Sequence, residues 1–189
     1  WLPEDYIIKC SQEVDLNKFA GMDCYVGVDL AATSDLTAVA YLVVLDGTYH
    51  FKTHYYLPES ALKDKADKEL YKYWKQQGYL TVTSGNVTDY DYITTDMLRY
   101  ADVVNIQSVG YDKYNATQWA IDSTEQGLPL EEYPQTLGNF NMPTRELERL
   151  ILSGKAVIDN NEINRYCWKS HSTLPLLATQ NYPFWLKYD

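Results

Sequence analysis

The sequence predicts an α/β domain in which helices cover the faces of a mixed β-sheet. Three strand-like segments come first in the chain, and helical and strand-like segments alternate after them. This order is typical of a mixed sheet packed against helices. A chain of 189 residues, 46% of them hydrophobic, can bury a core of its own without disulfide bonds.

The first three strands are expected to form an antiparallel meander. Residues 25–29 (YVGVD) and 36–45 (LTAVAYLVVL) are apolar runs rich in β-forming residues, and residues 49–56 alternate. Asp46-Gly47, between the second and third runs, is a strong two-residue hairpin signal. Residues 1–23 show no strong period and are expected to be an arm or linker.

Helices and strands are expected to alternate along the rest of the chain. A helix is predicted over 59–77 and a short strand over 79–83, and Asp89 is the expected N-cap of a helix over 90–100. A strand over 103–111 then leads directly into Asp112. The remaining expected elements are a helix from 115 or 116 to 127, a strand over 130–133, a helix from the N-cap Thr144 to Ser153, a strand over 156–158 and a helix over 162–169.

Composition and charge exclude several classes of protein. No run of about 18 apolar residues is present, so no membrane-spanning helix is expected, and the N-terminus lacks the pattern of a signal peptide. Cys10, Cys24 and Cys167 are odd in number and widely spaced, which is typical of free thiols in a reducing cytoplasm. The net charge of −10 requires any DNA-binding face to depend on bound cations and on the C-terminal third.

Two acidic residues each end an apolar strand-like segment: Asp29 follows YVGV, and Asp112 follows VVNIQSVGY. Carboxylates on adjacent strands at the rim of a sheet repel each other unless a divalent cation binds between them. Hard oxygen ligands favour Mg²⁺ or Mn²⁺ over zinc, and a pair of such ions can activate water against a phosphodiester. The pattern predicts a catalytic metal site, whereas capping of the following turn or helix is the alternative for either residue alone.

Other polar residues give weaker signals. Asp35 either faces the metal or fixes its turn, and the turn is favoured. His50 and His54 would share one strand face, where a surface or core position is favoured over a metal site. Three basic residues are candidates for contacts with the DNA backbone, with a solvated surface as the alternative: Arg145 and Arg149, four apart on one helix face, and Lys155.

Four separate segments resemble the nuclease domain of the terminase large subunit of tailed phages, in the family's order and spacing. They read GVDLAATSDLTAVAYL, QGYLTVTSGNVTDYDYI, GYDKYNATQW and MPTRELERLILSGKAV, and they run from about residue 25 to 157. The resemblance implies a ribonuclease H-like fold and an endonuclease that cuts concatemeric viral DNA during genome packaging. In that family two catalytic acids hold two Mg²⁺ or Mn²⁺ ions, and they match Asp29 and Asp112.

The resemblance also implies partners, a location and a domain division. Double-stranded DNA, the terminase small subunit and the portal protein would be the partners, in the cytoplasm of an infected or lysogenic bacterium and away from membranes. Residues 1–24 look like the linker that follows an N-terminal ATPase domain, and 25–189 are expected to form the nuclease domain. No G-x-x-x-x-G-K-[ST] loop is present, so this chain is not expected to hydrolyse ATP.

The chain departs from the family pattern near its C-terminus. The family's third metal-binding Asp, in a basic-Ile-Asp-Gly segment, has no counterpart after Ser170, where Asp189 is the only acid, and Asp159 is the nearest alternative. A non-catalytic terminase-derived module that docks on the portal or another protein therefore stays open as an alternative. An actin-like ATPase is disfavoured, because no glycine-rich loop follows Asp112.

Overall fold

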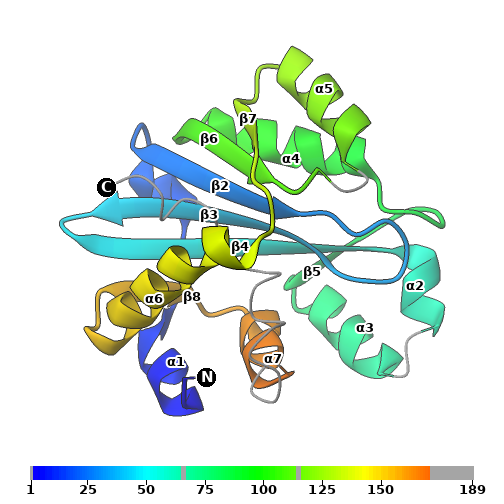
Figure 1. Cartoon of the computed structure of the whole chain (residues 1–189). Helices are drawn as coiled ribbons and strands as arrows, with labels where there is room; N and C mark the ends of the chain where they lie inside the picture. The colour runs from blue at the N-terminus through cyan, green and yellow to red at the C-terminus, as the bar shows by residue number, and fades with distance from the viewer. Residues whose placement is uncertain (1, 65–66, 114–115, 171–189) are drawn as a thin grey trace.

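The computed structural model describes residues 2–64, 67–113 and 116–170, which fold around one eight-stranded mixed sheet. Its strand order is β1-β8-β4-β3-β2-β6-β7, and β5 pairs with β4 (Figure 1). The strands are β1 (Ser11–Gln12), β2 (Asp23–Asp29), β3 (Thr37–Leu45), β4 (Thr48–Pro58), β5 (Leu80–Thr83), β6 (Asn105–Tyr111), β7 (Leu130–Glu132) and β8 (Ala156–Asp159).

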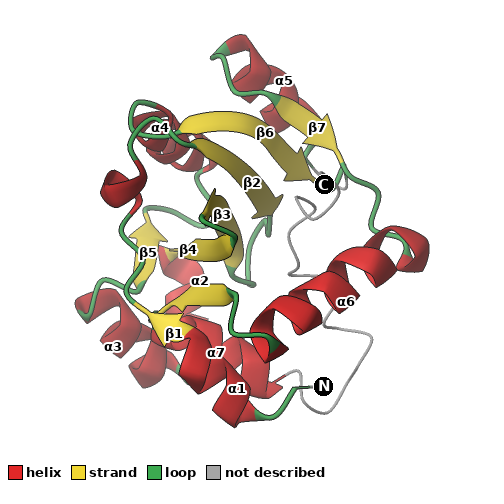
Figure 2. Cartoon of the chain, turned by 90° about the vertical axis from the view of Figure 1, so that its left-hand side faces the viewer, coloured by secondary structure: helices red, strands yellow, loops and turns green. Residues whose placement is uncertain are grey.

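Helices cover both faces of this sheet, which confirms the predicted α/β class (Figure 2). One face packs against α4 and α5, and the other against the remaining α-helices. The helices are α1 (Glu4–Cys10), α2 (Glu59–Asp64), α3 (Lys68–Gln76), α4 (Tyr90–Ala101), α5 (Thr117–Glu125), α6 (Leu137–Leu152) and α7 (Glu162–Ser170), with a 3₁₀ turn η1 (Leu16–Phe19). In the part of the chain that is described, none of them is long and apolar enough to span a membrane.

The predicted meander of β2, β3 and β4 is confirmed. β2 pairs antiparallel with β3, and β3 pairs antiparallel with β4. Asp46 (φ 50°) and Gly47 (φ 72°) both take the left-handed conformation that a tight two-residue hairpin needs. Alternation along β2 places Val26 and Val28 in the core against α4 and α5, so Asp29 falls on the opposite face.

β4 pairs with two different strands along its outer edge. β8 pairs with it over Tyr49–Phe51, and β5 pairs with it over Tyr55–Pro58. Between these two segments the sheet opens into a fork at residues 52–54, which have a described strand partner only in β3. The fork makes room for polar side chains at the level where β8 ends.

The start of α6 corrects the prediction that Thr144 caps this helix. The helix begins at Leu137, and its N-cap is Thr136, eight residues before Thr144; the Thr136 side chain accepts a hydrogen bond from the Asn139 N–H. Pro143 lies inside the helix and cannot donate to the carbonyl four residues before it. The Tyr133 hydroxyl donates to that Asn139 carbonyl instead, at 2.7 Å, so the proline leaves no acceptor unsatisfied there.

The N-terminal segment is more ordered than the expected arm. Residues 4–19 form α1, β1 and η1, and they bury apolar side chains against the sheet, among them Ile7, Leu16 and Phe19. β1 pairs parallel with β8, so this segment also extends the sheet. The helix predicted over 59–77 is two helices, α2 and α3, with residues 65–66 outside the described part of the chain.

Candidate active site

Asp29 and Asp112 lie beside each other at one edge of the sheet. β2 and β6 are adjacent and parallel, and Val28 pairs with Tyr111, so the residue that follows each of them comes next in register. Alternation puts both on the face opposite to Val28 and Tyr111, whose side chains pack with α4 and α5. The strands therefore bring together the two acids that the sequence singles out.

The surroundings of Asp29 disfavour the ionised form of its carboxyl group. Burial, followed by the negative charges of Asp112 and Asp35, raises the pKa of the Asp29 carboxyl to about 6. Two further carboxylates thus act on Asp29 at this edge, although Asp35 itself is exposed. A divalent cation between the carboxylates would relieve this repulsion.

The loop of residues 30–36, which joins β2 to β3 and carries Asp35, is held by two buried threonines. The Thr37 hydroxyl accepts from the Ala31 N–H at 2.9 Å and donates to the Ala31 carbonyl at 3.3 Å. From the segment before α4, the Thr88 hydroxyl donates to the same carbonyl at 2.6 Å, and the Thr88 N–H donates to the Ala32 carbonyl at 2.9 Å. We call these four bonds the threonine clamp.

An ion pair flanks Asp112. The Lys113 ammonium lies 3.3 Å from the Glu132 carboxylate, and register places Glu132 beside Tyr111 on the adjacent strand β7. Both side chains are well exposed, so the pair adds little to stability. It does place a cation next to the acidic edge.

Sequence reasoning did not single out the threonine clamp or the Lys113–Glu132 pair. No pattern near Thr88 hints at Ala31, because 57 residues separate the two. Lys113 directly follows a candidate catalytic acid, which is the one signal that could have drawn attention to it. The clamp depends on the tertiary fold, and a single sequence does not encode it in a local pattern.

The three basic candidates for DNA contacts lie on and after α6, and all are exposed. Arg149 forms an ion pair with Glu146 one turn earlier on the helix. The Lys155 carbonyl accepts a hydrogen bond from the Tyr49 N–H. Tyr49 lies six residues along β4 from Tyr55, and the pairing of the strands places Tyr55 at the level of Asp29. At about 3.3 Å per residue, Lys155 is on the order of 20 Å from the acids along the strand direction. DNA binding by Arg145, Arg149 and Lys155 stays a prediction.

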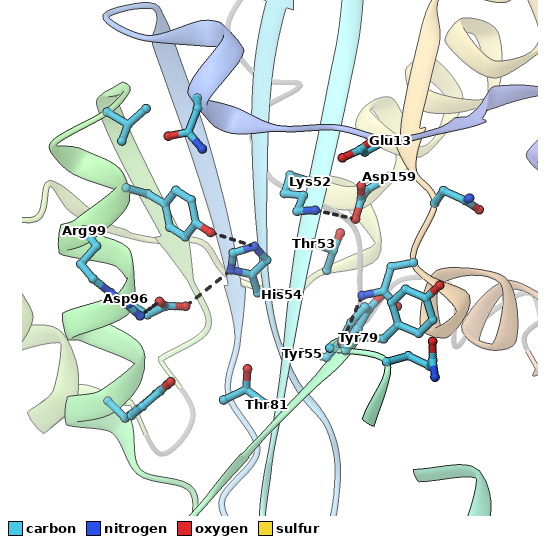
Figure 3. Close-up of a pocket in the computed structure, with 18 residues that line it drawn as sticks. Glu13, Lys52, Thr53, His54, Tyr55, Tyr79, Thr81, Asp96, Arg99 and Asp159 are labelled. Atoms are coloured by element: carbon cyan, nitrogen blue, oxygen red, sulfur yellow. Dashed lines mark hydrogen bonds and ion pairs between the residues drawn. The ribbon is translucent and has the colours of Figure 1, made fainter. Parts of the chain in front are cut away.

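Asp159, the nearest alternative for a third metal ligand, belongs to a different cluster. It ends β8, three strands from β2 in the sheet, and accepts from Lys52 Nζ at 3.0 Å and from the Val14 N–H at 3.0 Å. Figure 3 shows this ion pair in a pocket of about 760 Å³ at the fork of the sheet. Asp159 is therefore too far across the sheet to share a metal site with Asp29 and Asp112.

His54 lies in the same pocket, on the same face of β4 as Lys52 (Figure 3). Its Nδ1 is 3.5 Å from the Asp96 carboxylate, and its Nε2 is 3.5 Å from the Tyr100 hydroxyl. Although burial opposes ionisation, hydrogen bonds from His54 and Tyr56 lower the pKa of Asp96 below its usual range. His50 instead packs against Phe19 in a tilted arrangement, with ring centroids 4.8 Å apart, so the two histidines have separate structural roles.

The donors at the acidic edge suit a hard divalent cation, but they form only part of a site. Asp29 and Asp112 supply carboxylate oxygens. The negative charge of Asp112 disfavours ionisation of Asp29, and a bound cation would offset that repulsion. Within residues 2–64, 67–113 and 116–170, no group of three or more His, Cys, Asp or Glu side chains is arranged to hold a metal ion. Asp189 falls outside the described residues.

Comparison with known families decides the relationship. The family model described as "Terminase large subunit, endonuclease domain" matches residues 4–166. The chain belongs to this family. The match also includes the N-terminal helix and strand that pack on the sheet, so these elements fall within the matched domain.

Curated relatives agree with this assignment. Protein YmfN of Escherichia coli K12 is 29% identical over 171 residues, covering 82% of this chain and 37% of that protein. The terminase large subunit of Enterobacteria phage HK97 is 29% identical over 136 residues, covering 69% of this chain and 27% of that protein. The chain thus spans about a third of the length of these relatives.

Solved structures confirm the ribonuclease H-like fold. The crystal structure of the HK97 large terminase superposes with a TM-score of 0.71 at 24% identity, over 82% of this chain and 33% of that one. The large terminase of a thermophilic bacteriophage, in complex with ADP, gives a TM-score of 0.53 at 12% identity, over 84% of this chain and 32% of that one. At these identities the likeness concerns the fold alone.

Proposed function

We propose that this domain is a divalent-metal-dependent endodeoxyribonuclease that cuts concatemeric viral DNA during genome packaging. The observation that carries the proposal is the juxtaposition of Asp29 and Asp112 at the ends of adjacent parallel strands. Membership of the terminase nuclease family supports it. The partners would be double-stranded DNA, the terminase small subunit and the portal protein, in the cytoplasm of an infected or lysogenic bacterium.

In this proposal Asp29 and Asp112 hold Mg²⁺ or Mn²⁺ as a two-metal site. Metal ions bound there would activate a water molecule and stabilise the leaving oxygen of the phosphodiester. The backbone positions the metal ligands: two neighbouring strands hold the carboxylates, and the threonine clamp holds the loop that follows Asp29. Arg145, Arg149 and Lys155 would contact DNA phosphates, with little preference for sequence.

Nicking of supercoiled plasmid with Mn²⁺ tests the proposal. Asp29→Ala and Asp112→Ala are each expected to lower the nicking rate by at least about 100-fold, since even residues that only orient metal ligands contribute about 10–100-fold. Asp46→Asn is the matched control, because Asp46 is exposed at the β3–β4 hairpin and asparagine tolerates its positive φ. Equal rates in the parent protein and both alanine variants would contradict the proposal.

A non-catalytic docking module is the second candidate function. The net charge of −10 favours it, as does the lack, among the described residues, of a group of three or more acidic, His or Cys side chains arranged to hold a metal ion. Such a module would bind the portal or another packaging protein and would leave plasmid intact even at high Mn²⁺. The plasmid assay therefore separates the two functions directly.

A further inference from the structure

We propose that Thr88 is a positioning residue for the metal site, acting through the loop of residues 30–36. This inference rests on the proposed function, because the site it serves is the one at Asp29 and Asp112. The loop begins directly after Asp29 and carries Asp35, whose charge reaches Asp29. Whatever fixes the loop therefore fixes how these carboxylates face a cation.

The contacts of Thr88 concentrate on this loop. Its hydroxyl and its N–H donate to two successive carbonyls, those of Ala31 and Ala32, at 2.6 and 2.9 Å. Thr88 is only 5% exposed and Thr37 is fully buried, whereas Ala31 is half-buried and Ala32 is exposed, so water is excluded from the threonine side of these bonds. A pair of bonds to successive peptides restricts both the position and the orientation of that stretch of backbone.

The segment that carries Thr88 is itself anchored on two helices. Ser60, at the start of α2, donates through its N–H and its hydroxyl to the Gly85 and Asn86 carbonyls, both at 3.2 Å. Asp89 caps α4 by accepting from the Tyr92 N–H at 2.9 Å. Thr88 thus couples the end of β2 to rigid elements that contribute no acid to the edge.

Loss of the Thr88 hydroxyl should weaken metal binding more than it weakens the fold. Thr88→Val keeps the shape and the backbone bond but removes the 2.6 Å bond, leaving the Ala31 carbonyl with the longer bond from Thr37. We expect the Mn²⁺ dissociation constant, measured by calorimetric titration, to rise about tenfold. Thr88→Ser retains the hydroxyl and should stay within about twofold of the parent protein.

Two further measurements identify the cause. Amide hydrogen exchange of Ala31 in metal-free protein should accelerate in Thr88→Val but not in Thr88→Ser, because the clamp holds that peptide before any metal binds. Ser11→Ala is the matched control: it also removes a hydroxyl-to-carbonyl bond, at 2.8 Å to Ile7, but on the far edge strand β1. It should change neither Mn²⁺ binding nor Ala31 exchange.

Each outcome of these measurements is decisive. Unchanged Mn²⁺ affinity in Thr88→Val, with a parent protein that binds Mn²⁺, overturns the role of Thr88 and leaves the proposed function standing. A parent protein that neither binds Mn²⁺ nor nicks plasmid overturns both. If Thr88→Val does not fold, Thr88→Cys replaces the hydroxyl with a weaker donor of similar size, and normal Mn²⁺ affinity despite accelerated Ala31 exchange in that variant would overturn the proposal.

Discussion

Asp29→Asn is expected to stabilise the metal-free protein at neutral pH while it removes metal-dependent cleavage. Burial and two neighbouring carboxylates raise the pKa of Asp29 to about 6, so its ionised form is unfavourable in the folded state. The folded protein then binds a proton more tightly than the unfolded chain, and the free energy of unfolding falls as pH rises from about 4 to 6. At pH 7.5 the full penalty is present, about 2–3 kcal/mol.

Urea and thermal unfolding in EDTA at pH 4 and pH 7.5 measure this effect. At pH 7.5 the Asn variant should unfold about 5–10 °C above the parent protein, whereas at pH 4 the two should nearly coincide. Asp46→Asn, the exposed control, should shift the melting temperature equally at both pH values. Parallel stability of Asp29→Asn and the parent protein between pH 4 and 7.5 would show that Asp29 is not under electrostatic strain.

Asp159→Ala is expected to cost about 3–5 kcal/mol of the free energy of unfolding, the largest loss predicted for one side chain here. Asp159 is only 6% exposed and accepts from both Lys52 and the Val14 N–H. Its removal leaves the Lys52 ammonium without its carboxylate at the fork of the sheet, and Val14, itself 2% exposed, loses an acceptor. A buried donor without an acceptor costs about 1–3 kcal/mol by itself.

A double-mutant cycle in urea separates the ion pair from the backbone bond. Lys52→Met combined with Asp159→Ala should cost less than the two single changes added together, because each single change strands the other partner. Glu69→Gln is the matched control, since the Glu69–Lys72 pair is exposed and should contribute less than about 1 kcal/mol. A loss of that small size in Asp159→Ala would mean that the pocket solvates Lys52 well without its partner.

Local sequence patterns predicted those elements that depend mainly on interactions between residues close in the sequence. The β2–β4 meander follows from apolar runs and the Asp46-Gly47 turn, and the Asp89 cap follows from its position before an amphipathic helix. Strand-terminal acids predicted where Asp29 and Asp112 lie, and the adjacency of β2 and β6 brought them together. The catalytic and metal-binding roles of both residues stay predictions.

The errors arose where distant residues override a local rule. Thr144 was predicted to cap the helix, but α6 already includes Pro143, because the hydroxyl of Tyr133 replaces the bond that the proline removes. Residues 4–19 looked irregular because their helix and strand are short and gain stability from packing on the sheet. Thr88 carried no visible role, since its partners, Ala31 and Ala32, lie far away in the sequence, in the first loop of the meander.

β8 lies between β1 and β4 in the sheet, but it follows all the other described strands in the chain, so the sheet is completed only after β8 has been synthesised. β2, β3 and β4 follow one another in the chain, β3 pairs with both of the others, and β6, which pairs with β2, precedes β8 by more than 40 residues. Asp29 and Asp112 are therefore both synthesised well before β8. Until residues 156–159 are made, β1 lacks its partner and the outer edge of β4 at Tyr49–Phe51 stays open to other chains. Addition of β8 thus closes the outer edge of β4, away from the strands that lead into Asp29 and Asp112.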